Sequence, residues 1–287
     1  MQIGIGLPNP IPGTGGRLLV EWAKRAEERG FSSLATIDRI AYPSYESLIA
    51  LAAAAAVTER IGLLTNILLG PTRDPVLLAK EAASVDQISG GRLTLGVAVG
   101  GREDDFTAVG KEFSNRGQRW DEALELMHQA WRGEPVAGSP NPVTPSPVNE
   151  GGVPLLIGGG ADAAFERVAR WGVGWTAGGL PPDQAGQMAE RVRQAWREAS
   201  RKGEPRLVAL AYYALGDAAE ARGSAYIKDY YAFLGPWADQ IAQGIARTPE
   251  MIRQYTDAFA SAGFDELILD PTIAELEQVD LLADVVL

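Results

Sequence analysis

Eight short apolar segments, each followed by a segment of helical character, run along the 287-residue chain. The apolar segments, which have the length of buried strands, cover residues 2–7, 33–37, 61–69, 93–99, 153–157, 173–177, 206–214 and 265–269. The helical segments cover residues 15–29, 45–59, 74–89, 116–132, 161–171, 182–201, 248–262 and 273–286. This alternation is typical of βα units and a parallel sheet. Eight units favour an α/β fold of the closed (β/α)8 TIM-barrel type, in a single domain covering residues 1–287, over an open doubly wound sheet.

Two segments depart from the repeating unit. Residues 133–152 are rich in proline and glycine, so we expect an irregular connection at the N-terminal face or along the side of the barrel. Residues 215–247 form an insertion between the seventh predicted strand and the seventh helix, which places them at the C-terminal face. The insertion contains the aromatic residues Tyr226, Tyr230, Tyr231, Phe233 and Trp237. It is predicted to be an extra helix packed on the barrel, a lid or wall of a substrate site, or both.

Composition excludes several kinds of site and partner. The net charge of −11 argues against nucleic acid and anionic membranes as partners. The chain has no cysteine, which rules out disulfides, thiolate metal sites and cysteine nucleophiles. Its one histidine, His128, cannot form a multi-histidine metal centre, and its place on a predicted helix indicates a structural role. We therefore predict no metal site.

The sequence also bears on the cellular location of the protein. The first residues, MQIGIGLPNP, lack a basic region followed by a long apolar run, so we predict no signal peptide. The alanine-rich stretch 50–57 is too short to span a bilayer. We expect a cytoplasmic protein.

Two glycine pairs flank the predicted strand 93–99. Gly90-Gly91 precede the strand and fall at the N-terminal face, where they indicate a tight helix-to-strand turn. Gly100-Gly101 follow the strand and fall at the C-terminal face, where active sites gather in barrels of this type. Missing side chains there allow a ligand to approach the backbone closely. The two pairs are predicted to serve different purposes.

The stretch LLIGGGADAAFERVA, residues 155–169, runs from a strand through three glycines into a helix. Backbone N–H groups at such a helix N-terminus bind phosphate, so we predict an anion site there. The stretch lacks the Walker Lys-Ser/Thr and the GxGxxG spacing, and the alternative is a glycine-rich turn without a ligand. The next strand end, GWTAGG (residues 174–179), adds Thr176 to the same predicted phosphate site.

Polar residues end two other predicted strands. Asp38 and Arg39 follow the second strand, where they either hold a ligand or form salt bridges with neighbours. Thr65 and Asn66 interrupt the third apolar run, where they either bond a ring system at the barrel mouth or form a bulge. The acidic motif GREDDF, residues 101–106, is predicted to be a solvated loop rather than a metal site.

Three further stretches are distinctive: TERIGLLTNILLGPTRDPVLLAKEAASVDQISGGRLTLGVAVGG (58–101), VTPSPVNEGGVPLLIGGG (143–160) and ARWGVGWTAG (169–178). They resemble the bacterial luciferase-like monooxygenase family, which also includes F420-dependent oxidoreductases. The resemblance covers about residues 1–275 and implies a flavin or F420 cofactor at the C-terminal face. By motif position, it implies a ring system near Leu7, Asp38, Thr65, Asn66, Val99, Gly100 and Gly101. It implies a cofactor phosphate near Gly158, Gly159, Gly160, Trp175 and Thr176.

The chain also departs from the family pattern. Asp38-Arg39 stand where many members have Asp-His or His-His, so a luciferase-type histidine base is missing. Val99 stands near the position of an arginine that binds the FMN phosphate in some members, with Arg102 three residues further on. Val173 stands where an aspartate is common. For these reasons no catalytic residue is predicted.

The resemblance predicts a flavin-dependent oxidoreductase, with an FMN-type monooxygenase acting on a small organic substrate as the leading hypothesis. An F420-dependent hydride-transfer enzyme is the first alternative, because the missing histidine weakens the luciferase-like route. A flavin-binding barrel without catalysis and a barrel hydrolase or lyase acting on a phosphorylated substrate are the others. The resemblance also implies a homodimer.

Overall fold

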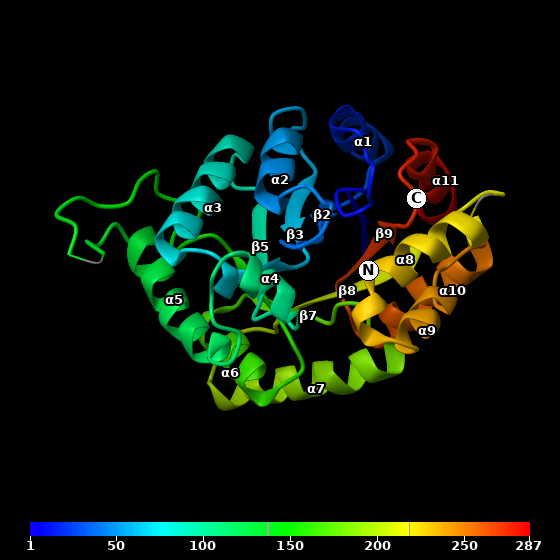
Figure 1. The fold of residues 1–287 in the computed structure, drawn as a ribbon. Helices are drawn as coiled ribbons and strands as arrows, with labels where there is room; N and C mark the ends of the chain where they lie inside the picture. Colours follow the sequence, from blue (N-terminus) through cyan, green and yellow to red (C-terminus); the bar gives the residue numbers. More distant parts are fainter. Residues whose placement is uncertain (137, 218) are drawn as a thin grey trace.

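The computed structural model describes residues 1–136, 138–217 and 219–287. In these residues nine strands form one parallel sheet that closes on itself (Figure 1). The strands are β1 (Gln2–Gly6), β2 (Ser33–Thr36), β3 (Gly62–Thr65), β4 (Leu68–Leu69), β5 (Leu93–Ala98), β6 (Leu155–Gly158), β7 (Gly174–Thr176), β8 (Arg206–Tyr213) and β9 (Glu266–Pro271). The pairing of β3 with β5 closes the ring, and β4 continues β3 as a second piece beside β5. The eight predicted strands and the closed barrel are thus confirmed, and the open sheet is excluded.

Eight helices follow the barrel strands and surround the sheet (Figure 1). They are α1 (Gly16–Arg29), α2 (Ser47–Ala55), α3 (Pro75–Ser89), α5 (Arg116–Trp131), α6 (Asp162–Trp171), α7 (Pro182–Glu198), α10 (Pro249–Ser261) and α11 (Glu277–Val286). Two of them begin at side-chain caps followed by proline. Asp74 accepts hydrogen bonds from the amides of Val76 and Leu77 at 3.0 and 2.9 Å, and Thr248 caps α10. In the described ranges no helix is long and apolar enough to cross a membrane.

Shorter elements lie at the C-terminal ends of the strands. The turn η1 (Gly70–Thr72) follows β4, and α4 (Glu103–Ala108) follows β5. The insertion between β8 and α10 contains η2 (Ala219–Gly223), α8 (Ser224–Tyr230), η3 (Ala232–Leu234) and α9 (Trp237–Gln243). The predicted insertion at the C-terminal face is therefore present, and its described residues form two short α-helices, a π-helical segment and a 3-10 turn.

The proline-rich connection between α5 and β6 runs along the side of the barrel. Its described residues, 133–136 and 138–152, contain no helix or strand. Side chains of α3 hold it: Lys80 Nζ donates to the Thr144 carbonyl at 2.6 Å, and Gln87 Nε2 donates to the Ser146 carbonyl at 2.8 Å. The buried carboxylate of Asp86 accepts from the Val148 amide at 2.7 Å. The segment is thus an irregular connection, as predicted.

The barrel interior is filled in its lower part and open at its upper end. Near the N-terminal face Arg206 donates to Glu266 at 2.6 Å, and Ser33 donates to the same carboxylate at 2.7 Å. The middle layer is a buried cluster to which five strands contribute one side chain each: Ala35, Leu64, Leu156, Val208 and Ile268. Nearer the C-terminal ends the strands carry Gly6, Gly96 and Gly158. The space of their missing side chains is taken by the Asp270 carboxyl group, the Thr65 carbonyl and the Ile67 side chain, respectively.

The two glycine pairs around β5 differ as expected. Gly90 and Gly91 have φ of +69° and +87°, and they turn the chain from α3 into β5 at the N-terminal face. Gly100, with φ of +79°, and Gly101 follow β5 at the C-terminal face, and Gly101 borders a cavity there. The first pair is a helix-ending turn, and the second lies beside the candidate site.

Candidate functional site

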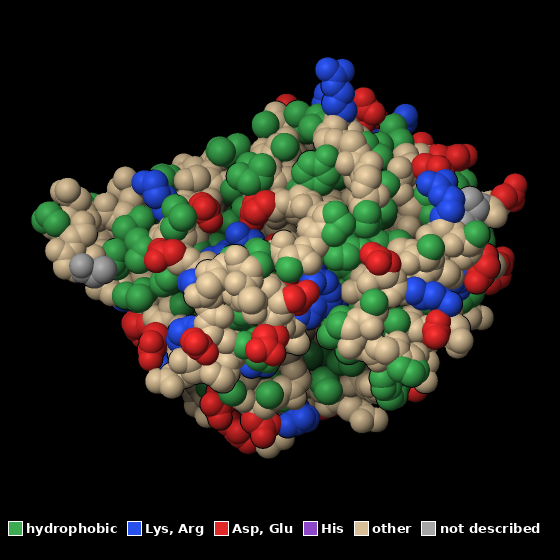
Figure 2. Space-filling view, viewed as in Figure 1, with side chains coloured by type: hydrophobic (Ala, Val, Ile, Leu, Met, Phe, Trp, Pro, Cys, Tyr) green, Lys and Arg blue, Asp and Glu red, His purple; other side chains and the backbone are tan. Residues whose placement is uncertain are grey.

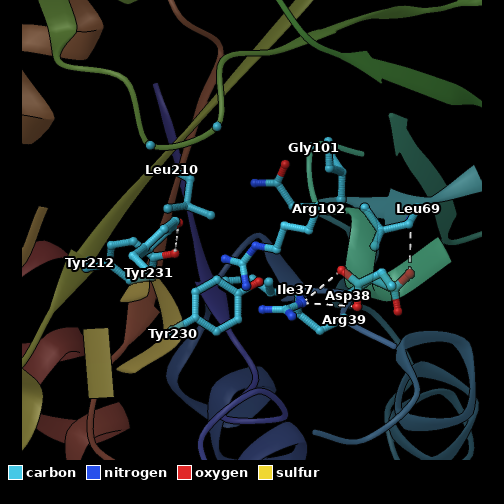
Figure 3. A pocket seen from close by; sticks show the side chains of 15 residues that line it. Ile37, Asp38, Arg39, Leu69, Gly101, Arg102, Leu210, Tyr212, Tyr230 and Tyr231 are labelled. Atoms are coloured by element: carbon cyan, nitrogen blue, oxygen red, sulfur yellow. Dashed lines mark hydrogen bonds and ion pairs between the residues drawn. The ribbon is translucent and has the colours of Figure 1, made fainter. Parts of the chain in front are cut away.

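A cavity of about 190 Å³ lies at the C-terminal end of the barrel, between the strand ends and the insertion (Figure 3). We call it the barrel-mouth cavity. It is lined by Ile37, Asp38, Arg39, Asn66, Ile67, Leu69, Gly101, Arg102, Asp105, Gly178, Gly179, Leu210, Tyr212, Tyr230 and Tyr231. The surrounding face is depressed at its centre, where basic side chains are visible (Figure 2).

A bulge between β3 and β4 forms part of the cavity wall. Its two residues, Asn66 and Ile67, are joined by a cis peptide bond. A Cβ atom built on Gly158 would lie 2.5 Å from Ile67 Cδ1, and one built on Gly96 would lie 3.4 Å from Ile67 Cγ2. The Ile67 side chain therefore fills the space that Gly158 leaves, and it makes an apolar surface at the end of the barrel. At Gly96 the space is taken by the Thr65 carbonyl oxygen, which would lie 1.9 Å from the added Cβ atom.

The other bulge residue supplies a polar group. Asn66 Oδ1 accepts a hydrogen bond from Thr176 Oγ1 at 2.7 Å, which fixes the side-chain amide. Its Nδ2 is buried and has no hydrogen-bond partner among the described residues. An unpaired buried donor is costly, and because Asn66 lines the cavity, this donor is placed to pair with an acceptor atom there.

Asp38, two residues after β2, accepts hydrogen bonds from three groups, one of which is the Ser47 hydroxyl at 3.4 Å. Arg73 Nη2 donates to both carboxylate oxygens at 2.9 and 3.0 Å, and the Leu69 amide donates to Oδ2 at 2.9 Å. Arg73 also pairs with Glu46 at 2.8 Å. Because these donors occupy the carboxylate, Asp38 ties β2 to β4 rather than serving as a free base.

Arg39 is bound by the acidic motif that follows β5. Its Nε lies 2.9 Å from the carboxylate of Asp105, which is fully buried, and its Nη2 lies 2.8 Å from Asp104. Asp105 also accepts hydrogen bonds from the amides of Ile40 and Ala41 at 2.8 and 2.7 Å. The prediction of a solvated loop is therefore wrong for Asp105, because the arginine and the two amides compensate its burial. No metal-binding group is present in the part of the chain that the structure describes.

Arg102 connects this edge of the cavity to the insertion. Its guanidinium carbon lies 4.4 Å from the ring centre of Tyr230 and 4.1 Å from that of Phe233. Within the described ranges the Arg102 side chain makes no ion pair or hydrogen bond, so aromatic rings are its main partners. The Tyr231 hydroxyl lies 2.8 Å from that of Tyr212 on β8. These contacts place the insertion over the cavity.

Replacing Arg102 with glutamine should loosen the insertion. Loss of the cation–π contacts removes about 1 kcal/mol from its attachment, so amide hydrogen exchange in residues 224–234 should become about fivefold faster. Arg222→Gln is the matched control, because Arg222 is exposed on the same insertion and pairs with Glu275 outside the cavity. Equal exchange rates in the two variants would show that Arg102 does not hold the insertion.

A model of the luciferase-like monooxygenase family matches residues 1–279 of the chain. The chain belongs to the luciferase-like monooxygenase family. An uncharacterized protein of Mycobacterium tuberculosis is 33% identical over 208 residues, which cover 62% of this chain and 71% of the relative. The F420-dependent glucose-6-phosphate dehydrogenase of Kribbella flavida is 34% identical over 147 residues, which cover 48% of this chain and 44% of the relative.

A solved structure has the same barrel fold over nearly the whole chain. It is an F420-dependent secondary alcohol dehydrogenase in complex with an F420-acetone adduct. The TM-score is 0.83 at 18% sequence identity, with 99% of this chain and 98% of that chain covered. At this identity the similarity supports the barrel fold and leaves the ligand of this luciferase-like chain open.

The structure brings some of the predicted cofactor residues of this luciferase-like barrel together. Asp38, Asn66 and Gly101 line the barrel-mouth cavity, Thr176 reaches it through Asn66, and Gly158 lies beneath Ile67. The other predicted residues do not line the cavity: Leu7, Thr65, Val99, Gly100, Gly159, Gly160 and Trp175. Assignment of all twelve residues to a cofactor stays a prediction.

Two of the outlying residues have clear contacts within the chain. Thr65 Oγ1 donates to the Gly96 carbonyl at 2.7 Å. Trp175 is buried near Phe165 and Phe264, and its Nε1 donates to the Gly159 carbonyl at 2.9 Å. Thr65 therefore joins neighbouring strands, and Trp175 supports the glycine turn from behind.

Sequence reasoning missed several residues of the site in this luciferase-like chain. Leu210 and Tyr212 line the cavity because alternate residues of β8 face the barrel interior, but the apolar run 206–214 carries no sign of which residues do so. Arg73 was missed because its partner Asp38 is distant in sequence. His128 has the predicted structural place: it stacks on Trp171 at 4.7 Å, and burial lowers its pKa.

Proposed function

We propose that this chain is a flavin-dependent oxidoreductase, an FMN-type monooxygenase that acts on a small organic substrate, and that the cofactor ring binds in the barrel-mouth cavity. The observation that carries the proposal is the Asn66–Ile67 bulge. It combines the apolar surface of Ile67, which packs over Gly158, with Asn66 Nδ2, which has no hydrogen-bond partner in the described residues. A flat ring with acceptor atoms at its edge fits such a surface. When bound, a reduced flavin would supply the electrons for oxygen chemistry.

The residues of the chain would bind and shield the ring. Asn66 would donate a hydrogen bond to it, and Ile67 would support one side. Tyr230 and Tyr231, with Arg102 against them, would cover the cavity and limit the entry of water. The cofactor phosphate would lie beside Gly159 and Gly160, before the N-terminus of α6.

F420-dependent hydride transfer is the second candidate. The 34% identity to the F420-dependent glucose-6-phosphate dehydrogenase of Kribbella flavida favours it. The absence of a histidine after β2 also favours it over luciferase-like oxygen chemistry. In both cases the residues of the bulge would hold the ring, so cofactor binding separates the two candidates.

The deciding experiment titrates the purified protein with FMN and with F420, each oxidised and reduced, and follows tryptophan fluorescence. A preference for reduced FMN, with oxygen uptake on addition of substrate, would support the monooxygenase. Tight binding of F420 alone would support hydride transfer, and binding without turnover across a substrate panel would indicate a non-catalytic barrel. Failure to bind either cofactor would refute the proposal. Sedimentation of the same samples tests the homodimer expected from the resemblance.

The predicted phosphate position is tested by comparing Gly159→Ala with Gly91→Ala. Both glycines have positive φ, +118° and +87°, and a Cβ atom at either would lie 3.1–3.2 Å from a neighbour. The two variants should therefore lose similar stability. Only Gly159 lies at the C-terminal face, so Gly159→Ala should weaken cofactor binding by about tenfold, or about 1.4 kcal/mol. Equal affinities in the two folded variants would contradict a phosphate at Gly159.

A further inference from the structure

A second cavity, of about 500 Å³, lies beside the barrel-mouth cavity. It is bounded by the start of α7, the end of β8, α9 and α10, and we call it the apolar groove. Its walls include Leu180, Trp237, Ile241 and Phe259, and no residue that lines it carries a charge. Hydrophobic side chains are visible in the hollow between α7 and α9 (Figure 2).

The apolar groove and the barrel-mouth cavity share a wall. Gly179, Leu210 and Tyr212 line both of them. The Tyr212 hydroxyl is paired with that of Tyr231, so the boundary between the two cavities includes a hydrogen-bonded aromatic pair. A molecule in the groove would therefore lie next to the position proposed for the cofactor ring.

Size and polarity distinguish the two cavities. Ligand pockets commonly measure about 300–1,000 Å³, a range that includes the groove and exceeds the barrel-mouth cavity. The Tyr255 hydroxyl donates to the Gly244 carbonyl at 2.9 Å, so this polar group of the groove is already paired. The side chains of Gln184 and Gln240 are exposed. The interior of the groove therefore favours binding of an apolar group.

The groove is also open to solvent. Trp237, on its outer wall, is 64% exposed, which is unusual for so large an apolar side chain. Its neighbours Phe233 and Leu234 are exposed as well. Exposed apolar surface around a cavity is a common mark of a binding site, and here it would be the entrance.

We propose that the apolar groove binds the uncharged apolar body of the substrate, an alkyl or aryl-alkyl group, while the reacting end of the substrate faces the barrel-mouth cavity at the shared wall. Only the placement of the reacting end of the substrate rests on the proposed function. The groove, its lack of charge and its shared wall do not depend on which cofactor binds.

The test measures binding of phenol, para-ethylphenol, para-butylphenol and para-pentylphenol to the purified protein by isothermal titration calorimetry. Each added methylene buried in the groove should tighten binding by about fourfold. The series is measured without cofactor, with FMN and with F420. An affinity that does not change with alkyl length would overturn the inference.

Matched variants locate the binding. Leu180→Glu places a charge in the groove, and it should weaken binding of para-butylphenol at least tenfold while leaving phenol almost unchanged. Leu77→Glu is the control, because Leu77 is exposed on α3, outside both cavities. Its alkylphenol affinities should equal those of the unmodified protein. Equal weakening in the two variants would show that the probes bind elsewhere.

The outcomes separate this inference from the proposed function. If neither cofactor binds and the alkyl series behaves as expected, the proposed function is wrong and the groove remains a binding site. If a cofactor binds and Leu180→Glu leaves the affinities of the alkylphenol series unchanged, the groove inference is wrong. A dimer that Leu180→Glu dissociates and Leu77→Glu does not would assign the groove to a second copy of the chain, which also overturns the inference.

Discussion

Replacing Asp105 with asparagine should lower the free energy of unfolding by about 3 kcal/mol. The Asp105 carboxylate is fully buried, and the Arg39 side chain that pairs with it is only 6% exposed. Loss of the negative charge leaves the guanidinium with Asp104, whose side chain is 57% exposed and largely solvated. It also weakens the hydrogen bonds from the Ile40 and Ala41 amides, which shape the loop after β2.

Urea denaturation followed by tryptophan fluorescence measures the effect, and Asp104→Asn is the control. Asp104 pairs with the same guanidinium at 2.8 Å but lies at the surface, so its loss should cost about 0.5 kcal/mol. The difference in unfolding free energy between the two variants isolates the effect of burial, because the two substitutions are chemically identical and adjacent in sequence. If both variants lose the same stability, the pair of Arg39 with Asp105 is not the stabilising contact.

The barrel was predictable because its signal is local. Each strand is a short apolar run, and each helix carries its own periodicity and ends, so alternation alone identifies eight βα units. The predicted strand 61–69 was only partly correct, because it is not continuous in the structure. Asn66 interrupts it, and the structure divides it into β3 and β4 at that residue. The sequence left a bulge and a ligand contact open as alternatives, and the structure shows a bulge with one amide group of Asn66 unpaired.

The site was less predictable because its contacts join distant residues. Strand ends converge in a barrel, which is why Asp38, Asn66 and Gly101 were found from position alone. Arg39 and Asp105 are 66 residues apart, and the local sequence around either residue does not indicate that the two side chains pair. The motif GREDDF therefore resembled a solvated loop, although one of its three acids is buried.

Asp270, near the end of β9, differs from Asp105 in lacking a partner. Its side chain is buried, and neither carboxylate oxygen has a hydrogen-bond partner in the described residues. A Cβ atom built on Gly6 would lie 1.8 Å from Asp270 Oδ1, so the carboxyl group packs against the bare backbone of β1. Burial raises the pKa of Asp270 well above its ordinary value, because no nearby charge stabilises the ionised form.

This raised pKa fixes the direction of the pH dependence. The native carboxyl keeps its proton at pH values where the unfolded chain has lost it, so the native state binds more protons. The contribution of the Asp270 carboxyl group to the free energy of unfolding is fully present below about pH 4 and is lost as the pH rises through the native pKa. The tyrosines nearest in register, Tyr212 and Tyr213, have pKa values that burial raises, so they stay neutral in this range.

Asp270→Asn should therefore become more stable than the unmodified protein as the pH rises. An amide has nearly the shape of a protonated carboxyl and does not titrate, so the two proteins should have similar stability near pH 4. Above that pH the difference in unfolding free energy should grow by up to about 1.4 kcal/mol per pH unit until the native carboxyl ionises. Urea denaturation at pH 4, 5.5, 7 and 8 measures it, with Asp105→Asn as the partnered aspartate that should lose stability at neutral pH. A difference that stays constant with pH would mean that Asp270 has a compensating partner, and that its carboxylate is as well stabilised in the barrel as in water.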